Sequence, residues 1–234
     1  MNIRYQFGQL AARFGYRILR EYKYPHVHGS LLQLGFSLLK TRIVGPIQLI
    51  QIGAFDGKLA DPLETILQDR RVVALLVEPQ LTPFQALVNR YSANPRIRLA
   101  NCVVGNSDGE ATLYVPGIGA SPEASLNPRF YRRFGLSRSS VREIQVTSCS
   151  VTSLLAKYAV GRVNVLQLDT EGYDFEILSW FFAAGQQPEL VNFESLHLSR
   201  TDRQASREFL RKAYCFVETE QDTFAIKESL IADP

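Results

Sequence analysis

Cysteine is scarce in this sequence, with three residues among 234 and no CxxC spacing (Cys102, Cys149 and Cys215). This pattern indicates neither a disulfide framework nor a zinc site, and it favours a reducing compartment. Long apolar runs are also missing, because no stretch approaches the ~18 residues of a membrane span. Arginine and glutamine residues interrupt the N-terminal segment, so no signal-peptide core is visible. We therefore expect a cytoplasmic protein.

Net charge is low, and it is unevenly distributed. The value of +3 is too small to indicate a nucleic-acid partner, and we expect none. Residues 1–45 carry a net +6, so residues 46–234 sum to −3. Within 1–45, apolar residues recur every three or four positions, which is typical of a helix. We predict an N-terminal helical arm over 1–45 and a main domain over 46–234.

Two interpretations of this basic arm stay open. A basic amphipathic helix can lie on an anionic membrane surface or form a contact between copies of the chain. More simply, the arm packs on its own domain and turns its basic face to solvent. Gly8 and Gly15 each weaken an isolated helix by about 1 kcal/mol, so the arm needs a surface to pack on.

From Pro46 onward, strand-like and helical patterns alternate, which is typical of an α/β fold with a mostly parallel sheet. The predicted strands are Ile47–Ile52, Val72–Val77, Ile97–Val104, Val163–Leu168, Leu190–Phe193, Cys215–Val217 and Thr223–Ile226. The predicted helices are Leu31–Lys40, Pro62–Gln68, Pro83–Tyr91, Tyr173–Ala183 and Asp202–Ala213. A turn and a strand follow Gly105, where a doubly wound fold would usually place a helix.

The stretch Gln48–Lys58 (QLIQIGAFDGK) has the pattern of the first strand followed by a glycine-rich turn. Ligands of open α/β sheets bind at the carboxyl ends of the strands, and glycine lets backbone N–H groups approach them closely. The turn is not a dinucleotide fingerprint, because G-x-G-x-x-G would need glycine at Phe55 and Lys58. No phosphate-binding G-x-x-x-x-G-K-[ST] motif occurs either. An NAD-dependent oxidoreductase and a nucleoside-triphosphate enzyme are therefore disfavoured.

Acidic residues follow three further strands of the predicted sheet. They are Glu78 after the second strand, Asp169 and Glu171 after the fourth, and Glu194 with His197 after the fifth. A carboxylate at the end of the second strand is where ribose hydroxyls are commonly bound in this kind of fold. Because parallel strands end at the same edge of a sheet, we expect all these residues to converge beside the glycine turn.

The segments IQIGAFDGKLADPL, LLVEPQ, VTSLL and LQLDTEGYDFEIL, in this order, resemble the FkbM-type S-adenosylmethionine-dependent methyltransferases. The late segment ESLHLS, followed by DTFA, is similar to that of one subgroup. The resemblance runs from about residue 47 to about residue 227 and leaves the arm unexplained. It implies a Rossmann-like methyltransferase sheet with an antiparallel C-terminal strand, S-adenosylmethionine as the cofactor, and a hydroxyl group as the acceptor.

The resemblance also implies which residues contact the cofactor. They are Gly53, Asp56 and Gly57 for the methionine and ribose part, Glu78 for the ribose hydroxyls, and Pro79, Asn101 and Cys102 for the adenine. Such methyltransferases often carry an acid two residues before the first glycine, where this chain has Gln51. An amide can still hydrogen-bond the cofactor's amino group, but it lacks the charge.

Methyl transfer to a hydroxyl needs alignment of the reacting atoms and a group that takes the proton. His197 is the best base by the intrinsic pKa of its side chain, and Asp169, Glu171 and Glu194 are the acids near it. Alternatively, a magnesium ion on Asp169, Glu194 and His197 would lower the pKa of the acceptor. Two simpler interpretations stay open: a histidine hydrogen-bonded to a nearby loop, and carboxylates that bind sugar hydroxyls.

The segment Pro128–Arg142 carries five arginines and no acid: Arg129, Arg132, Arg133, Arg138 and Arg142. It either binds a phosphate of the acceptor or forms a solvated basic loop. We predict an S-adenosylmethionine-dependent O-methyltransferase that acts on a sugar or another polyhydroxylated metabolite, as a small molecule or within a glycan. The alternative, favoured by Gln51, is a non-catalytic binding module on the same fold.

Overall fold

The computed structural model describes residues 30–58 and 63–232, without the side chains of Arg133 and Phe134. The predictions for residues 1–29 of the arm, and for the start of the helix expected at Pro62, concern residues outside these ranges. None of the described helices has the length and apolar character needed to cross a bilayer.

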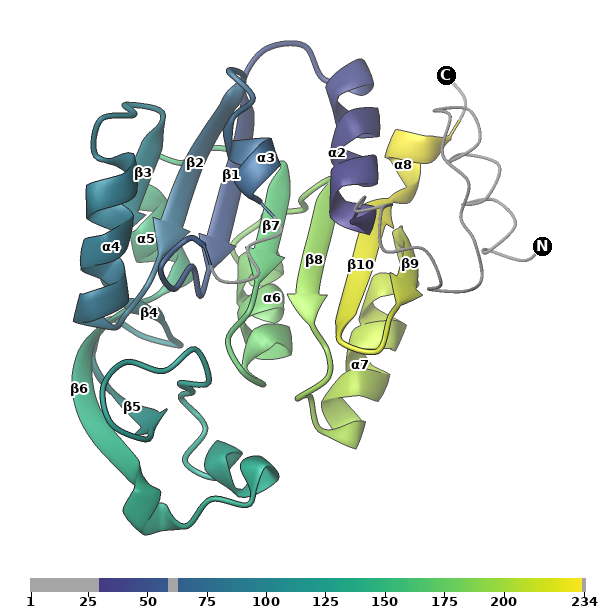
Figure 1. Cartoon of the computed structure of the whole chain (residues 1–234). Coiled ribbons are helices and arrows are strands. Elements are labelled where there is room, and N and C mark those ends of the chain that lie inside the picture. The colour runs from purple at the N-terminus through teal and green to yellow at the C-terminus, as the bar shows by residue number, and fades with distance from the viewer. Residues whose placement is uncertain (1–29, 59–62, 233–234) are drawn as a thin grey trace, which may run out of the picture.

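A seven-stranded sheet in the order β3-β2-β1-β7-β8-β10-β9 forms the centre of the fold (Figure 1). Its strands are β1 (Ile47–Ile52), β2 (Val72–Val77), β3 (Ile97–Ala100), β7 (Val165–Leu168), β8 (Leu190–Glu194), β9 (Tyr214–Glu218) and β10 (Asp222–Lys227). Neighbouring strands are parallel except β10, which is antiparallel to both β8 and β9. The predicted fold class, a Rossmann-like and mostly parallel sheet with an antiparallel C-terminal strand, is confirmed.

Strand β1 is the topological switch point of this sheet. It pairs in parallel with β2 on one side and with β7 on the other. The order of strands along the chain reverses at β1, and doubly wound sheets bind ligands in the crevice outside the carboxyl ends at such a point. A site is therefore expected beside the ends of β1, β2 and β7.

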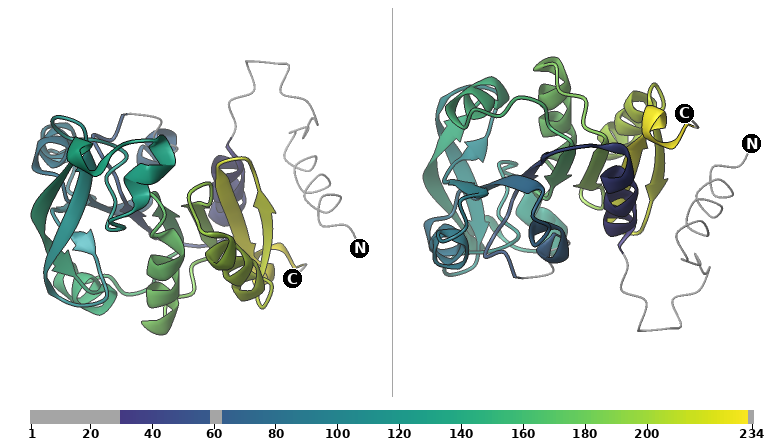
Figure 2. Two further views of the ribbon diagram at one scale, coloured as in Figure 1. Left: turned by 90° about the horizontal axis from the view of Figure 1, so that it is seen from below. Right: turned by 90° about the horizontal axis from the view of Figure 1, so that it is seen from above.

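Helices cover both faces of the sheet, which explains the unbroken apolar runs of its central strands (Figure 2). The helices on one face are α2 (Leu31–Arg42), α3 (Glu64–Leu67), α4 (Leu81–Tyr91) and α8 (Glu228–Ile231). Those on the other face are α5 (Val151–Lys157), α6 (Asp174–Ala183) and α7 (Arg200–Leu210). Along β1, Leu49 packs into the core on the face covered by α2, α3, α4 and α8, and Ile50 packs into the core on the face covered by α5, α6 and α7. The side chains of a strand alternate between the two faces of a sheet, as seen here.

Helix α2 belongs to the packed domain. It begins with a capping box, in which Ser30 Oγ accepts the N–H of Gln33 and the Gln33 side chain accepts the N–H of Ser30. Phe36 is buried in the same core as β1. Near the end of the helix, Lys40 Nζ lies 3.2 Å from an Asp69 carboxylate oxygen. Helix α2 therefore packs on the domain.

A second, three-stranded sheet in the order β4-β6-β5 lies beyond the carboxyl ends of β1 and β2 (Figure 1). Its strands are β4 (Val103–Val104), β5 (Gly109–Pro116) and β6 (Val141–Cys149). The predicted strand Ile97–Val104 is thus divided between two sheets, and neither β6 nor α5 is among the predicted elements. The β5–β6 connection contains two short 3-10 helices, η1 (Phe130–Phe134) and η2 (Arg138–Ser140).

Candidate active site

A cavity of about 220 Å³ lies at the switch point, next to the carboxyl ends of β1, β2 and β7. Side chains from the strand ends and the loops after them form one wall. Pro122, Ala124 and Leu126 from the β5–β6 connection form part of the opposite wall. The predicted convergence of the strand ends on one site is what the structure shows at this cavity.

The glycine turn after β1 forms one edge of the cavity. Gly53 has a φ of 84°, and a Cβ atom there would lie 1.8 Å from the carbonyl oxygen of Asp169, so a larger residue does not fit. The N–H groups of Gly53 and Ala54 both donate to the carbonyl oxygen of Val77 at 3.0 Å. The turn is thereby held between the ends of β2 and β7.

Glu78 directly follows β2 and lines the cavity with its side chain almost fully buried, at 2% exposure. Its Oε2 accepts the N–H of Phe55 at 2.9 Å, and its Oε1 accepts the N–H of Gln80 at 2.7 Å. Burial raises the pKa of Glu78 to about 7, against the lowering effect of these hydrogen bonds. Each oxygen keeps a second lone pair, so the carboxylate can still accept a hydrogen bond from a ligand.

Three of the predicted cofactor residues, Asp56, Gly57 and Asn101, are not among the residues that line the cavity. Asp56 accepts a hydrogen bond from the backbone N–H two residues later, at 2.9 Å. Gly57 packs against α4, where a Cβ atom would overlap a leucine side chain. Asn101 Nδ2 donates to the carbonyl oxygens of Glu78 and Pro79, at 2.9 and 3.0 Å. Their contacts are with the loops after β1 and β2 and with α4, whereas Pro79 itself lines the cavity.

Amide side chains form part of the cavity wall next to β1 and β7. Gln51 and Gln167 lie opposite each other in the register of the two strands, and each is 4% exposed. Gln167 Oε1 accepts a hydrogen bond from Asn192 Nδ2 on β8, at 3.0 Å. Gln167 was not among the predicted site residues, although a glutamine inside the apolar strand VLQL is a signal that sequence reasoning can use.

Cys102 lines the cavity on the side of the second sheet. Burial and the neighbouring thiol of Cys149 raise the pKa of Cys102 to about 12. Cys102 is therefore a neutral, weakly polar part of the wall, suited to an apolar group of a ligand.

The loop after β7 brings two acids to the cavity. Glu171 has a φ of 59°, unusual for a residue other than glycine, and Gly172 follows with a φ of 93°. Asp174 is fully buried and accepts the N–H groups of Thr170 and Gly172, both at 3.2 Å. This arrangement fixes a tight loop in which Asp169 and Glu171 both line the cavity.

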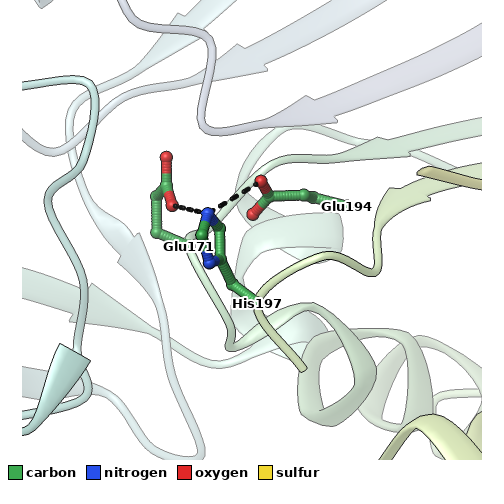
Figure 3. A group of neighbouring side chains, drawn as sticks. All are labelled: Glu171, Glu194 and His197. Carbon is green, nitrogen blue, oxygen red and sulfur yellow. Dashed lines mark ion pairs between the residues drawn. The ribbon is translucent and has the colours of Figure 1, made fainter. Parts of the chain in front are cut away.

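Beside the cavity, Glu171, Glu194 and His197 point toward one another (Figure 3). His197 Nε2 lies 3.6 Å from Glu171 Oε2 and 3.4 Å from Glu194 Oε1. The ring of Phe130, from η1, packs against the imidazole with the centroids 5.0 Å apart and the planes at 83°. The group differs in one member from the predicted metal ligands, because Glu171 stands where Asp169 was expected. The contact with Phe130 was not predicted.

The acids of the site repel one another in poorly solvated surroundings. Burial, together with nearby Glu171 and Asp169, raises the pKa of Glu194 to about 10. The surrounding protein and Asp222 raise the pKa of Asp169 to about 6, although its side chain opens to the cavity. Burial also raises the pKa of Asp174 to about 7, with Asp169 adding to the effect. Glu194 therefore holds a proton at neutral pH unless a cation lies close to it.

A larger hollow of about 720 Å³ lies at the opposite end of the sheet, near Gln48, Arg162 and Glu189. Two of its charged groups, Arg162 and Glu189, already form an ion pair with each other. It also lies at the amino ends of the parallel strands, away from the edge where doubly wound folds bind ligands. The smaller cavity is therefore the candidate active site.

The fold is similar to that of the methyltransferase FkbM from Methylobacillus flagellatus KT, with a TM-score of 0.51 and 14% sequence identity. That match covers 77% of this chain and 43% of the other, so this chain spans less than half the length of that protein. An O-methyltransferase from Bacillus cereus, in complex with SAH, gives a TM-score of 0.42 and 12% identity, covering 96% of this chain and 90% of the other. No curated protein matches the chain in sequence.

The family comparison covers the site itself. A model of the methyltransferase FkbM domain matches residues 51–219, which is well over half of the chain. The matched range begins at Gln51 and includes the glycine turn, Glu78, and the group around His197. The chain therefore belongs to the FkbM-type S-adenosylmethionine-dependent methyltransferases.

Proposed function

We propose that the protein transfers the methyl group of S-adenosylmethionine to a hydroxyl of a sugar or another polyhydroxylated molecule, free or within a glycan. A hydroxyl group is proposed as the methyl acceptor because His197 Nε2 lies between Glu171 and Glu194, beside the cavity. A base held between carboxylates suits the removal of a proton from a hydroxyl group.

The cavity residues fit the cofactor in their chemistry. Gly53 leaves room where any side chain would overlap the backbone. Glu78 retains lone pairs for ribose hydroxyls, and Pro79 with Cys102 offers a weakly polar border for the adenine. Gln51 offers a carboxamide oxygen to the cofactor's amino group. When bound, the cofactor supplies a methyl group that is already activated on a sulfonium.

His197 would accept the proton of the acceptor hydroxyl. Glu171 Oε2 and Glu194 Oε1 lie near Nε2, so the imidazolium that forms there would favour the ionised form of both carboxyl groups. Glu194 Oε2 is buried without a hydrogen-bond partner among the described residues, so it is placed to exchange a hydrogen bond with an acceptor hydroxyl.

The same three side chains also suit a divalent cation such as magnesium. Their ligand-type atoms lie within 4.8 Å of one another, and two carboxylates with an imidazole are common metal ligands. A cation would lower the pKa of the acceptor and relieve the repulsion that raises the pKa of Glu194. Activity that is lost with EDTA and restored by Mg²⁺ would support a cation. Full activity in EDTA would leave proton transfer to His197 alone.

Titration calorimetry with S-adenosylmethionine is the first test, followed by transfer of a labelled methyl group to a panel of sugars and polyols. Glu78→Ala should weaken saturable cofactor binding, and the matched control Glu110→Ala, at an exposed position on β5, should not. Transfer to at least one acceptor would support the proposal. Cofactor binding without transfer to any acceptor would favour a non-catalytic binding module, and no binding would contradict both.

A further inference from the structure

Part of the β5–β6 connection is fastened over the candidate site. We call residues 121–131 the roof. The Gln80 side chain makes two hydrogen bonds to Ser121, donating to its carbonyl oxygen at 2.8 Å and accepting its N–H at 2.9 Å. Farther along, Ser125 Oγ donates to the carbonyl oxygen of Glu171 at 2.9 Å. The roof is therefore attached to the loops that follow β2 and β7.

Two arginines lie on one side of η1, which begins at the end of the roof. Phe130 is 2% exposed and rests against the His197 ring. A 3-10 helix has three residues per turn, so positions three apart lie on the same side of it. Arg129 and Arg132 are three apart, and both are exposed. We call these two residues the arginine pair.

Other arginines of the segment are already used by the protein. Arg138 forms an ion pair with Glu143 at 2.6 Å. Arg142 Nε donates to the carbonyl oxygen of Gly117 at 3.1 Å, and a second nitrogen donates to another backbone carbonyl. By contrast, the side chains of the arginine pair form no ion pair or hydrogen bond with any described residue. Their charges are available to a ligand.

The arginine pair lies next to an acidic centre. Phe130, which stands between the two arginines in sequence, touches the imidazole that Glu171 and Glu194 approach. A molecule bound with a hydroxyl at His197 would therefore extend from carboxylates toward guanidinium groups. Two neighbouring guanidinium groups match the geometry and charge of a phosphoryl group, which they can bind through paired N–H donors.

We propose that Arg129 and Arg132 bind a phosphoryl group of the acceptor, with Phe130 holding them in a fixed relation to His197. The inference rests on the proposed function for the hydroxyl that reacts. A nucleotide-linked sugar and an anionic lipid headgroup both carry such a phosphoryl group next to hydroxyls. The arginine pair then selects phosphorylated acceptors over neutral ones.

Titration of the full chain, saturated with S-adenosylmethionine, tests this inference. The soluble probes are UDP-glucose and inorganic phosphate, with glucose as the neutral comparison. Arg129→Gln and Arg132→Gln should each weaken the binding of UDP-glucose by about tenfold, because each removes a charge-assisted contact. Arg138→Gln is the matched control, since it removes an exposed arginine of the same segment that already pairs with Glu143. It should leave the affinity unchanged.

A second arm uses vesicles of phosphatidylcholine with and without phosphatidylglycerol. Arginine-dependent binding of UDP-glucose supports a soluble acceptor, and arginine-dependent binding to the anionic vesicles alone supports a lipid headgroup. The inference is overturned if no phosphorylated probe binds, if binding is unchanged in both Arg129→Gln and Arg132→Gln, or if Arg138→Gln weakens binding equally. Cofactor binding and methyl transfer are measured separately. Cofactor binding and methyl transfer without arginine-dependent phosphate binding would support the proposed function and contradict this inference.

Discussion

A Cβ atom added to Gly53 would lie 1.8 Å from the carbonyl oxygen of Asp169. The backbones that follow β1 and β7 therefore meet without room for a side chain between them. Gly53 also has a φ of 84°, in a region that residues with a side chain rarely adopt. Both residues line the cavity, so the shape of the candidate site depends on this contact.

Gly53→Ala should lower the free energy of unfolding by roughly 3–5 kcal/mol, because it adds a backbone overlap to the conformational strain. Gly45→Ala is a matched control, since Gly45 has a φ of 94° but a Cβ there meets nothing within 4 Å. The control should cost about 1–2 kcal/mol, from the strain alone. Urea unfolding of both variants measures the difference. Equal losses would contradict the close contact.

Glu78 should make stability depend on pH. Burial raises the pKa of folded Glu78 from 4.5 to about 7, so between these values the folded protein keeps a proton that the unfolded chain has released. Stability should therefore fall as pH rises through this window, by roughly 3 kcal/mol from this residue. Glu78→Gln should make the dependence shallower, as urea unfolding at a series of pH values would measure.

Asp169 and Asp174 act in the same direction, because their pKa values are raised to about 6 and about 7. The pH dependence should therefore shrink in Glu78→Gln without vanishing. Glu110→Gln, at an exposed position on β5, controls for the change in net charge. A dependence in Glu78→Gln as steep as in the parent would show that Glu78 is ionised across the whole window.

The central sheet could be predicted because its strands are covered on both faces. Ile47–Ile52 and Val72–Val77 form strands with the predicted bounds, since burial on both sides leaves unbroken or nearly unbroken apolar runs. The strand Val141–Cys149 escaped prediction because most of its side chains are exposed or half-buried, so no apolar run marks it. Helix Val151–Lys157 is too short for a clear helical period.

The sequence could predict those residues of the site that lie at or just after the ends of the strands, because the topology of the sheet fixes their positions. Glu171 follows β7, Glu194 is the last residue of β8, and His197 follows β8. Because β7 and β8 are adjacent and parallel, the sheet itself brings the three side chains together. Phe130 reaches His197 from a connection far away in the sequence, through tertiary packing that leaves no local pattern. Asp169 was predicted to lie in the group around His197, whereas the structure places Glu171 there. This difference depends on the left-handed backbone at Glu171, which the residue type alone does not indicate.

His197→Gln should reduce methyl transfer by roughly a hundredfold to ten-thousandfold, the usual contribution of a general base. Cofactor affinity should stay the same, because His197 lies beside the cavity and does not line it. Turnover with a labelled methyl donor and calorimetry with the same cofactor separate the two effects. Transfer that persists at the parental rate would remove His197 from the reaction and favour a cation or solvent as the proton acceptor.

The roof should become more protected when the cofactor binds. The cavity of about 220 Å³ is smaller than the roughly 300–1,000 Å³ usual for ligand sites. Pro122 and Leu126 line the cavity from the roof, so a bound cofactor would contact the roof and restrict its motion. Amide hydrogen exchange in residues 121–131 should therefore slow when S-adenosylmethionine is added.

Gln80→Ala provides the complementary test, because it removes both hydrogen bonds to Ser121 and should speed exchange in the roof of the free protein. The β9–β10 hairpin, at the far edge of the sheet, serves as the internal control and should exchange at the same rate in both proteins. Roof exchange that responds neither to the cofactor nor to the substitution would mean that residues 121–131 do not close the cavity. The cofactor would then have to enter without displacing Pro122 and Leu126, through an opening that leaves the attachment at Gln80 intact.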